Sequence, residues 1–209
     1  MTYSAELTLI WAGLIAIAVF AYVVLDGFDL GIGILSPLLG GEPARETAMN
    51  SVAPVWDGNE TWLVLGGGGL MAAFPLAYSI LMPAVYPPLI AMLLGLIFRG
   101  VAFEYRWRTT RARGAWDLGF FGGSTLAAFC QGVILGAILQ GVSLSGRSYA
   151  GGRLDWLTPF SILTGASVVA GYGLLGATWL ILKTQGALLA RSGYPLVGKM
   201  DRQAVCSGT

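Results

Sequence analysis

Five long apolar stretches constrain this chain more than any other feature of its sequence. Each has at least the roughly 20 residues that an α-helix needs to cross the hydrocarbon core of a bilayer. Of the 209 residues, 56% are hydrophobic and 11% are charged, against about 25% charged in soluble domains. The sequence therefore predicts an all-α fold, a polytopic integral membrane helical bundle over residues 1–185, followed by a polar C-terminal tail over 186–209. The helices are expected at about 7–39, 51–74, 79–98, 118–141 and 157–182.

A polar segment, residues 56–63, lies inside the second stretch and reads Trp-Asp-Gly-Asn-Glu-Thr-Trp-Leu. Asp57 and Glu60 are three residues apart, so we expect both on one face of a helix, below the lipid surface and reachable from the helix start. An acidic side chain at the centre of a membrane helix costs about 2.5 to 3.5 kcal/mol on insertion scales, and such residues often mark proton, ion or substrate pathways. We interpret the pair as a functional site; a purely structural role for Asp57 is the alternative.

A second acidic pair, Asp26 and Asp29, interrupts the first stretch. One interpretation is that these carboxylates end the apolar span at the lipid headgroups. The residues that follow, 30–39, are again apolar, which favours placing both carboxylates within the hydrophobic length. Gly27 and Gly31 lie beside them four residues apart, a spacing that lets another helix approach closely. Gly132 and Gly136 form a similar pair in the fourth stretch, where Gln131 and Gln140 are the strong polar groups.

The third stretch contains Pro83, Pro87 and Pro88, which predict a kinked helix, and it ends in Arg99 and Glu104. The arginines that follow fit a basic loop held at anionic headgroups. Arg99 and Glu104 are less easily explained in that way. They flank an uncharged segment and are expected to extend into the bundle, either as a charge pair or as anion-binding groups.

The basic residues also predict an orientation. Ten of the twelve lysines and arginines fall in the odd-numbered loops, beginning with the expected loop 40–50, and in the tail; Arg147 and Arg153 are the other two. The positive-inside rule then places the N-terminus outside and the tail in the cytoplasm. The ends of the first and third helices and the start of the second would share the cytoplasmic half, where their carboxylates and Arg99 would form a polar conduit.

The residue types exclude several classes of site. The chain has no histidine, the commonest ligand for haem, copper and zinc, so no metal site and no direct catalytic residue is predicted. Cys130 and Cys206 are far apart in the sequence and form no metal motif. The four glycines at 66–69 are not followed by the Lys-Ser or Lys-Thr of a phosphate loop. No basic tract is interleaved with aromatic residues, so a nucleic-acid partner is not expected.

Three segments together resemble subunit II of the cytochrome bd-type quinol oxidases, the subunit that carries no haem. They are residues 26–31 (Asp-Gly-Phe-Asp-Leu-Gly), the segment 56–63 quoted above, and residues 98–104 (Phe-Arg-Gly-Val-Ala-Phe-Glu). Their order and their places at successive helix ends make the match specific, and the resemblance extends over about residues 5–185. The family is built as two similar four-helix bundles. We therefore expect the first bundle and one helix of the second, with the chain truncated after the fifth helix.

The resemblance implies a multi-pass subunit in the bacterial inner (plasma) membrane, in a complex that oxidises quinol and reduces dioxygen to water. Haem b and haem d are ligated by the larger subunit I in that family, so this chain is expected to ligate no cofactor and to be inactive alone. Protons from the cytoplasm would enter at Asp26 and Asp29 and pass through Asp57, with Glu60 beside it. Other expected partners are membrane lipid, quinone and a small accessory subunit. Polar or partner contacts are expected at Trp56, Asn59, Arg99 and Glu104.

Two other functions fit the same residues. Kinked helices and carboxylates within the membrane also suit a proton- or ion-coupled transporter, although an inverted repeat with paired broken helices is not visible in these five stretches. A bare assembly or anchoring subunit would have no conduit, and replacing Asp57 by Asn would then leave turnover intact.

Overall fold

Helices make up most of the chain that the structure describes. The computed structural model describes residues 2–109 and 112–184, with side chains from residue 6 onward; the tail expected over 186–209 lies outside these ranges. This architecture confirms the all-α membrane bundle. The elements are α1 (Thr2–Leu35), the 3-10 turn η1 (Ser36–Leu38), α2 (Glu42–Val52), α3 (Trp56–Ala73), α4 (Pro75–Arg108), α5 (Arg113–Leu139), β1 (Leu144–Ser145), β2 (Ser148–Tyr149) and α6 (Pro159–Thr184).

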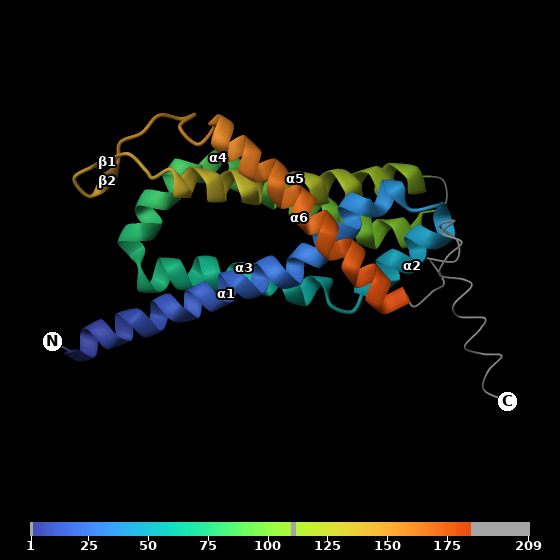
Figure 1. Cartoon of the computed structure of the whole chain (residues 1–209), viewed down its shortest axis with the longest axis horizontal. Coiled ribbons are helices and arrows are strands. Elements are labelled where there is room, and N and C mark those ends of the chain that lie inside the picture. The colour runs from blue at the N-terminus through green and yellow to red at the C-terminus, as the bar shows by residue number, and fades with distance from the viewer. Residues whose placement is uncertain (1, 110–111, 185–209) are drawn as a thin grey trace.

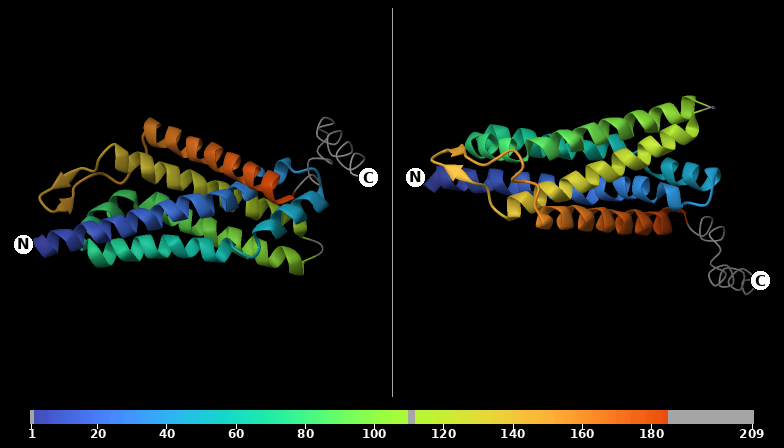
Figure 2. Two further views of the ribbon diagram at one scale, coloured as in Figure 1. Left: turned by 60° about the horizontal axis from the view of Figure 1, so that its bottom comes forward. Right: turned by 90° about the horizontal axis from the view of Figure 1, so that it is seen from above.

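The long helices run up and down between two ends of an elongated bundle (Figures 1 and 2). α1 leads away from the N-terminus, α3 returns beside it, α4 and α5 form an antiparallel pair, and α6 crosses both α1 and α5. The antiparallel hairpin of β1 and β2 lies at one end, here called the hairpin end. The short helix α2 lies at the opposite end, here called the α2 end, where α4 finishes and α5 begins.

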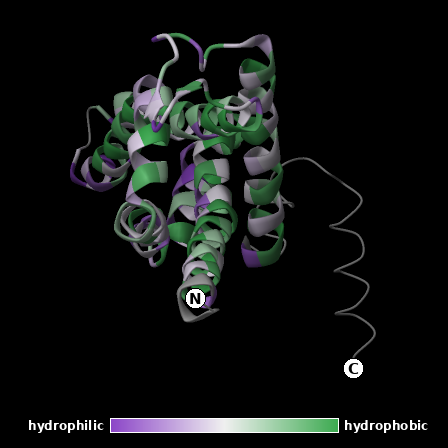
Figure 3. Ribbon diagram, turned by 90° about the vertical axis from the view of Figure 1, so that its left-hand side faces the viewer, coloured by the Kyte–Doolittle hydropathy of each residue, from purple (hydrophilic) through white to green (hydrophobic). Residues whose placement is uncertain are grey.

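Among residues 2–109 and 112–184, four helices are long and apolar enough to span a membrane, within α1, α4, α5 and α6. The fifth expected span corresponds to α3, which has 18 residues and begins with the polar segment 56–63. Seen end-on, hydrophobic residues cover much of the helices (Figure 3). The chain is therefore a multi-pass membrane protein.

The α2 end differs from the sequence prediction. Residues 40–50 were expected as a loop and 51–74 as one helix, but the structure has a helix over Glu42–Val52 and a second over Trp56–Ala73. Ala44, Ala48 and Val52 are buried at intervals of four residues, which is the spacing of one helical face. α2 thus forms because it packs this small apolar face against the bundle.

α4 is longer than the expected helix over 79–98, running from Pro75 to Arg108. Only Phe74 separates it from α3, so the turn expected over 75–78 is helical. Proline is tolerated in the first turn of a helix, and the later prolines produce the predicted kink, at Val85, whose φ of −117° and ψ of 16° are not helical. Beyond residue 98 the helix continues, because Arg99 and Arg106 are buried in the bundle rather than placed at the headgroups. The other long helices match their predicted ranges within a few residues at each end.

Glycines allow the closest helix crossings. A Cβ placed on Gly31 would lie 1.9 Å from the backbone oxygen of Tyr172 in α6, and one on Gly176 would lie 2.4 Å from the backbone carbon of Gly31. In α5, a Cβ on Gly132 would lie 2.6 Å from the Cα of Gly165 in α6. The expected role of the glycine pairs in helix approach is confirmed for α1 and α5, and α6 is the helix that packs against both.

Candidate functional site

A buried arginine on α4 organises the polar interior of the bundle. The Arg99 side chain is 1% exposed and lies among carboxylates from two other helices. Its Nη1 is 2.9 Å from Glu60 Oε1 on α3 and 3.5 Å from Asp26 Oδ1 on α1, and its Nη2 is 3.5 Å from Asp29 Oδ1. We call these four residues the Arg99 cluster.

Helix geometry explains how the cluster forms. Asp26 and Asp29 are three residues apart on α1, so both carboxylates face α4. Glu60 lies in the second turn of α3, where the helix passes beside α1. Of the charges expected at one depth, Asp26, Asp29 and Glu60 each lie within 3.5 Å of Arg99.

Two further residues of the segment 56–63 hold the cluster in place. Asn59 is buried, and its Nδ2 donates hydrogen bonds to Asp29 Oδ2 at 3.0 Å and to the backbone oxygen of Leu25 at 3.1 Å. The ring centroid of Trp56 lies 5.9 Å from Arg99 Cζ, within range of a cation–π interaction. Both residues were predicted as polar or partner contacts, and within this chain both contact the cluster.

Asp57 lies outside the Arg99 cluster. It is exposed in the structure of this chain, whereas Asn59 and Glu60 turn toward α1 and α4. None of the ion pairs between described residues includes Asp57. Of the pair expected on one helix face, only Glu60 contacts the Arg99 cluster in the chain on its own. At 100° per residue, Asp57 points about 160° away from Asn59, so it faces outward.

Glu104 is also separate from Arg99. Its Oε1 accepts a hydrogen bond from Arg108 Nη2 at 2.8 Å, one helical turn along α4, and both side chains are more than half exposed. The structure thus does not form the Arg99 and Glu104 pair that the sequence offered as one alternative. Glu104 instead belongs to the surface of the α2 end.

The Arg99 cluster has more acid than base. Three carboxyl groups face one guanidinium, and Asp26 Oδ1, Asp26 Oδ2 and Asp29 Oδ1 are buried without a hydrogen-bond partner among the described residues. A buried ionised carboxylate is costly unless it is paired and hydrogen-bonded. The cluster can therefore lower its energy by binding protons, and this is the chemistry that its geometry supports.

The sequence analysis missed a second ion network at the α2 end, centred on a buried arginine. Arg106, 1% exposed, places its Nε 2.5 Å from Asp117 Oδ1 and its Nη2 2.7 Å from Glu42 Oε2. Arg45 Nη1 reaches Asp117 Oδ2 at 2.8 Å. We call these four residues the α2 clamp, because they tie α2 to α4 and α5. The available signal was the spacing of Arg99 and Arg106, seven residues or two turns apart on one helix face.

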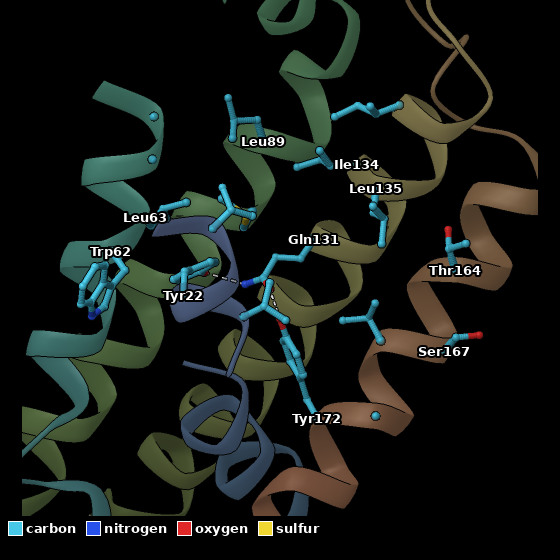
Figure 4. A pocket seen from close by; sticks show the side chains of 18 of the residues that line it. Tyr22, Trp62, Leu63, Leu89, Gln131, Ile134, Leu135, Thr164, Ser167 and Tyr172 are labelled. Carbon is cyan, nitrogen blue, oxygen red and sulfur yellow. Dashed lines mark hydrogen bonds between the residues drawn. The ribbon is translucent and has the colours of Figure 1, made fainter. Parts of the chain in front are cut away.

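A cavity of about 630 Å³ opens between α1, α3, α4, α5 and α6 (Figure 4). Its lining is mostly apolar, and its polar side chains include Tyr22, Gln131 and Tyr172. The sequence singled out Gln131 as a polar residue in an apolar helix but gave no reason to connect it with the two tyrosines. Their connection depends on the crossing of α1, α5 and α6.

No group of three or more histidine, cysteine or acidic side chains suited to a metal ion occurs among residues 2–109 and 112–184. Together with the lack of histidine in the sequence, this donor set does not fit a histidine-ligated haem or zinc ion. The fold and the site instead define a polytopic membrane subunit with a protonatable cluster in its interior.

Comparison with known proteins identifies the family. The chain belongs to the cytochrome bd terminal oxidase subunit II family, whose model matches residues 7–195, and the predicted resemblance is confirmed. It is 38% identical over 194 residues to cytochrome bd-I ubiquinol oxidase subunit 2 of Escherichia coli (strain K12), covering 89% of this chain and 51% of the relative. It is 33% identical over 192 residues to cytochrome bd ubiquinol oxidase subunit 2 of Bacillus subtilis, covering 90% and 57%. The chain thus spans about half the length of the curated relatives it matches.

Proposed function

We propose that this chain works as subunit II of a cytochrome bd-type terminal oxidase, in a complex that oxidises quinol and reduces dioxygen to water. Family membership over residues 7–195 supports this assignment. Because the chain has no histidine to ligate a haem, haem b and haem d would be ligated by a haem-bearing subunit I. The isolated chain is then expected to be inactive.

Within that complex, we propose that the chain carries protons from the cytoplasm toward the partner subunit. The observation that supports this role is the Arg99 cluster, with its excess of buried carboxyl groups. The Glu60 side chain is 26% exposed, while those of Asp26 and Asp29 are at most 1% exposed. Glu60 would therefore exchange protons with water or with Asp57, and the buried pair would receive them.

The direction of this pathway follows from charge. The α2 end carries Arg45, Arg106, Arg108, Arg113 and Lys183, whereas Arg147 and Arg153 lie in the segment at the hairpin end. Because basic residues remain on the cytoplasmic side of membrane proteins, the α2 end would face the cytoplasm and the N-terminus the outside. The membrane would be the inner membrane of a bacterium, as expected for the organisms of the named relatives.

The exposed position of Asp57 supports an assembly surface on α3. A carboxylate facing lipid at this depth is costly, whereas the same side chain facing a polar or basic group of subunit I would be stabilised. Thr61 is also exposed, one turn further along α3. We propose that subunit I covers this face, which would return Asp57 to the protein interior and place it between the two subunits as a relay. Lipid, quinone and a small accessory subunit remain proposed partners of the complex.

Co-purification with a haem-bearing subunit I tests the assignment. The tagged chain is expressed beside that subunit, and the eluate is examined by its reduced-minus-oxidised absorption spectrum and its quinol-dependent oxygen consumption. Asp57→Asn should retain the haem bands and lower turnover about a hundredfold or more, in the range of general acid–base catalysis. Glu104→Gln, the same chemical change at an exposed carboxyl, should change neither.

Full turnover of Asp57→Asn with normal haem content would refute the relay and favour a bare anchoring subunit. A colourless eluate from folded chain would count against the oxidase assignment, and proton-coupled transport in vesicles would then be the function to measure.

A further inference from the structure

Tyr22, Gln131 and Tyr172 form a hydrogen-bonded chain across three helices. Tyr172 on α6 donates through its hydroxyl to Gln131 Oε1 at 2.6 Å. Gln131 on α5 donates through Nε2 to the hydroxyl oxygen of Tyr22 on α1, also at 2.6 Å. Both hydrogen bonds are drawn in Figure 4, where the three hydrogen-bonded side chains lie along the cavity. Because the Gln131 amide accepts at its oxygen and donates at its nitrogen, the donor-to-acceptor direction of these hydrogen bonds runs from α6 to α1.

This direction leaves the Tyr22 hydroxyl proton free. The oxygen of Tyr22 already accepts from Gln131, so its own O–H must find another acceptor. Asp26 lies four residues along α1, on the same helix face, so its carboxyl is within reach of the Tyr22 hydroxyl. Tyr22 is 4% exposed and Asp26 is 0% exposed, which excludes bulk water as the usual partner. No described residue, Tyr22 included, forms a hydrogen bond to either carboxylate oxygen of Asp26 in the structure, so this carboxyl lacks the donor that the Tyr22 hydroxyl could supply.

Packing fixes Tyr172 at the other end of the chain. A Cβ on Gly27 would lie 2.9 Å from Tyr172 Cε1, so the ring lies directly against the backbone of α1. A Cβ placed on Gly31 would clash with the backbone oxygen of the same tyrosine. The close crossing of α1 and α6 therefore holds Tyr172, and through Gln131 it determines where the Tyr22 hydroxyl points.

We propose that Tyr22 is a positioning residue for Asp26: its hydroxyl donates a hydrogen bond to the Asp26 carboxyl, in a direction set by Gln131 and Tyr172. The other charged groups around Asp26 are Arg99 from α4, Glu60 from α3 and Asp29 from α1. Tyr22 lines the cavity, and Arg99 on α4 lies 3.5 Å from Asp26 Oδ1. Tyr22 would thereby hold the carboxyl in one orientation toward Arg99. The consequence for proton transfer rests on the proposed function, but the hydrogen bond itself does not.

Infrared spectroscopy of the purified full chain in lipid nanodiscs tests the hydrogen bond without any partner. The bands of Asp26 are those that Asp26→Asn removes from pH-difference spectra. A hydrogen bond lowers the stretching frequency of a carboxyl C=O group, so Tyr22→Phe should shift the Asp26 C=O band to higher wavenumber. Gln131→Leu should broaden the same band, because the Tyr22 hydroxyl then loses its fixed direction.

The matched control is Tyr86→Phe, which removes a hydroxyl from a tyrosine that is 60% exposed on α4 and should leave the Asp26 band unchanged. Circular dichroism confirms that each variant keeps its helices. An Asp26 band that stays in place in folded Tyr22→Phe would overturn the proposal, as would an equal shift in Tyr86→Phe.

Turnover in the complex with subunit I separates this proposal from the proton pathway. If both hold, Tyr22→Phe should slow oxygen consumption about tenfold, the factor expected for one hydrogen bond to a charged group, with the haem spectrum unchanged. A shifted Asp26 band with full turnover in both Tyr22→Phe and Asp26→Asn would support the positioning role and refute the pathway. An unshifted band with turnover lost only in Asp26→Asn would refute the positioning role and support the pathway.

Discussion

Replacing Gly31 by alanine should force α1 and α6 apart. The new Cβ would lie 1.9 Å from the Tyr172 backbone oxygen and 2.7 Å from the Gly176 backbone nitrogen. In an α-helix these two atoms belong to one hydrogen bond, from residue i+4 to residue i. The methyl group would therefore enter the backbone ladder of α6, where no side-chain rotation can make room.

The size of the effect follows from the overlap. A distance of 1.9 Å is far below the 3.0 Å under which Cβ contacts essentially never occur, so we expect the upper part of the 1–3 kcal/mol range for overpacking, about 3 kcal/mol. Alanine gains about 1 kcal/mol over glycine in helix propensity. Gly13→Ala on the same helix receives the same gain, and its Cβ would have nothing within 4 Å. The difference between the two variants thus isolates the clash.

Thermal unfolding of the full chain in detergent micelles, followed by circular dichroism, measures this difference. For a chain of this size 1 kcal/mol corresponds to about 2–4 °C, so Gly31→Ala should unfold about 6–12 °C below Gly13→Ala. Equal midpoints for the two variants would mean that α1 and α6 do not cross at Gly31. That result would also refute the packing of Tyr172 against α1.

Further predictions concern the two buried arginines. Arg99→Met removes the only cation of the Arg99 cluster and should lower the free energy of unfolding by about 3–5 kcal/mol. Arg108→Met, at an exposed ion pair, should change it by less than about 1 kcal/mol. Denaturant titration in micelles measures both changes, and equal effects would contradict the burial of Arg99. Arg106→Met should release α2 from the α2 clamp and expose the link at Gly41 to protease, and limited proteolysis that cuts the variant and the unchanged chain at the same rate would count against the clamp.

Local patterns predicted the site in part. The apolar lengths and the positions of the charged residues within them predicted that Asp26, Asp29, Asp57, Glu60 and Arg99 would share one half of the membrane as a polar conduit, and four of these five residues form the Arg99 cluster. The outward direction of Asp57 was not predictable from the i and i+3 spacing with Glu60. That spacing leaves the two side chains about 60° apart, and the contacts of Asn59 and Glu60 with α1 and α4 decide which way α3 turns.

Long-range partners explain the other differences. α4 was expected to end at residue 98 because charged residues follow, but Arg106 is buried by Asp117 and Glu42 from other helices. Likewise, the local sequence of the charged and proline-containing segment before residue 51 predicts a loop. The four-residue spacing of Ala44, Ala48 and Val52 was a signal for helix, although only the bundle provides the surface that this face needs.

The order of charges along the chain has a consequence for biogenesis. Asp26 and Asp29 enter the membrane first, Glu60 follows, and α4 then brings Arg99 and Arg106. An arginine at the centre of a lone inserted helix costs about 2.5–3.5 kcal/mol, so Arg99 becomes tolerable when α4 meets helices already inserted. The ion pairs of Arg106 cannot be complete until Asp117 has been synthesised after it. Insertion of α4 and assembly of the bundle are therefore coupled events, and the acidic residues of α1 act as an early docking point for a later helix.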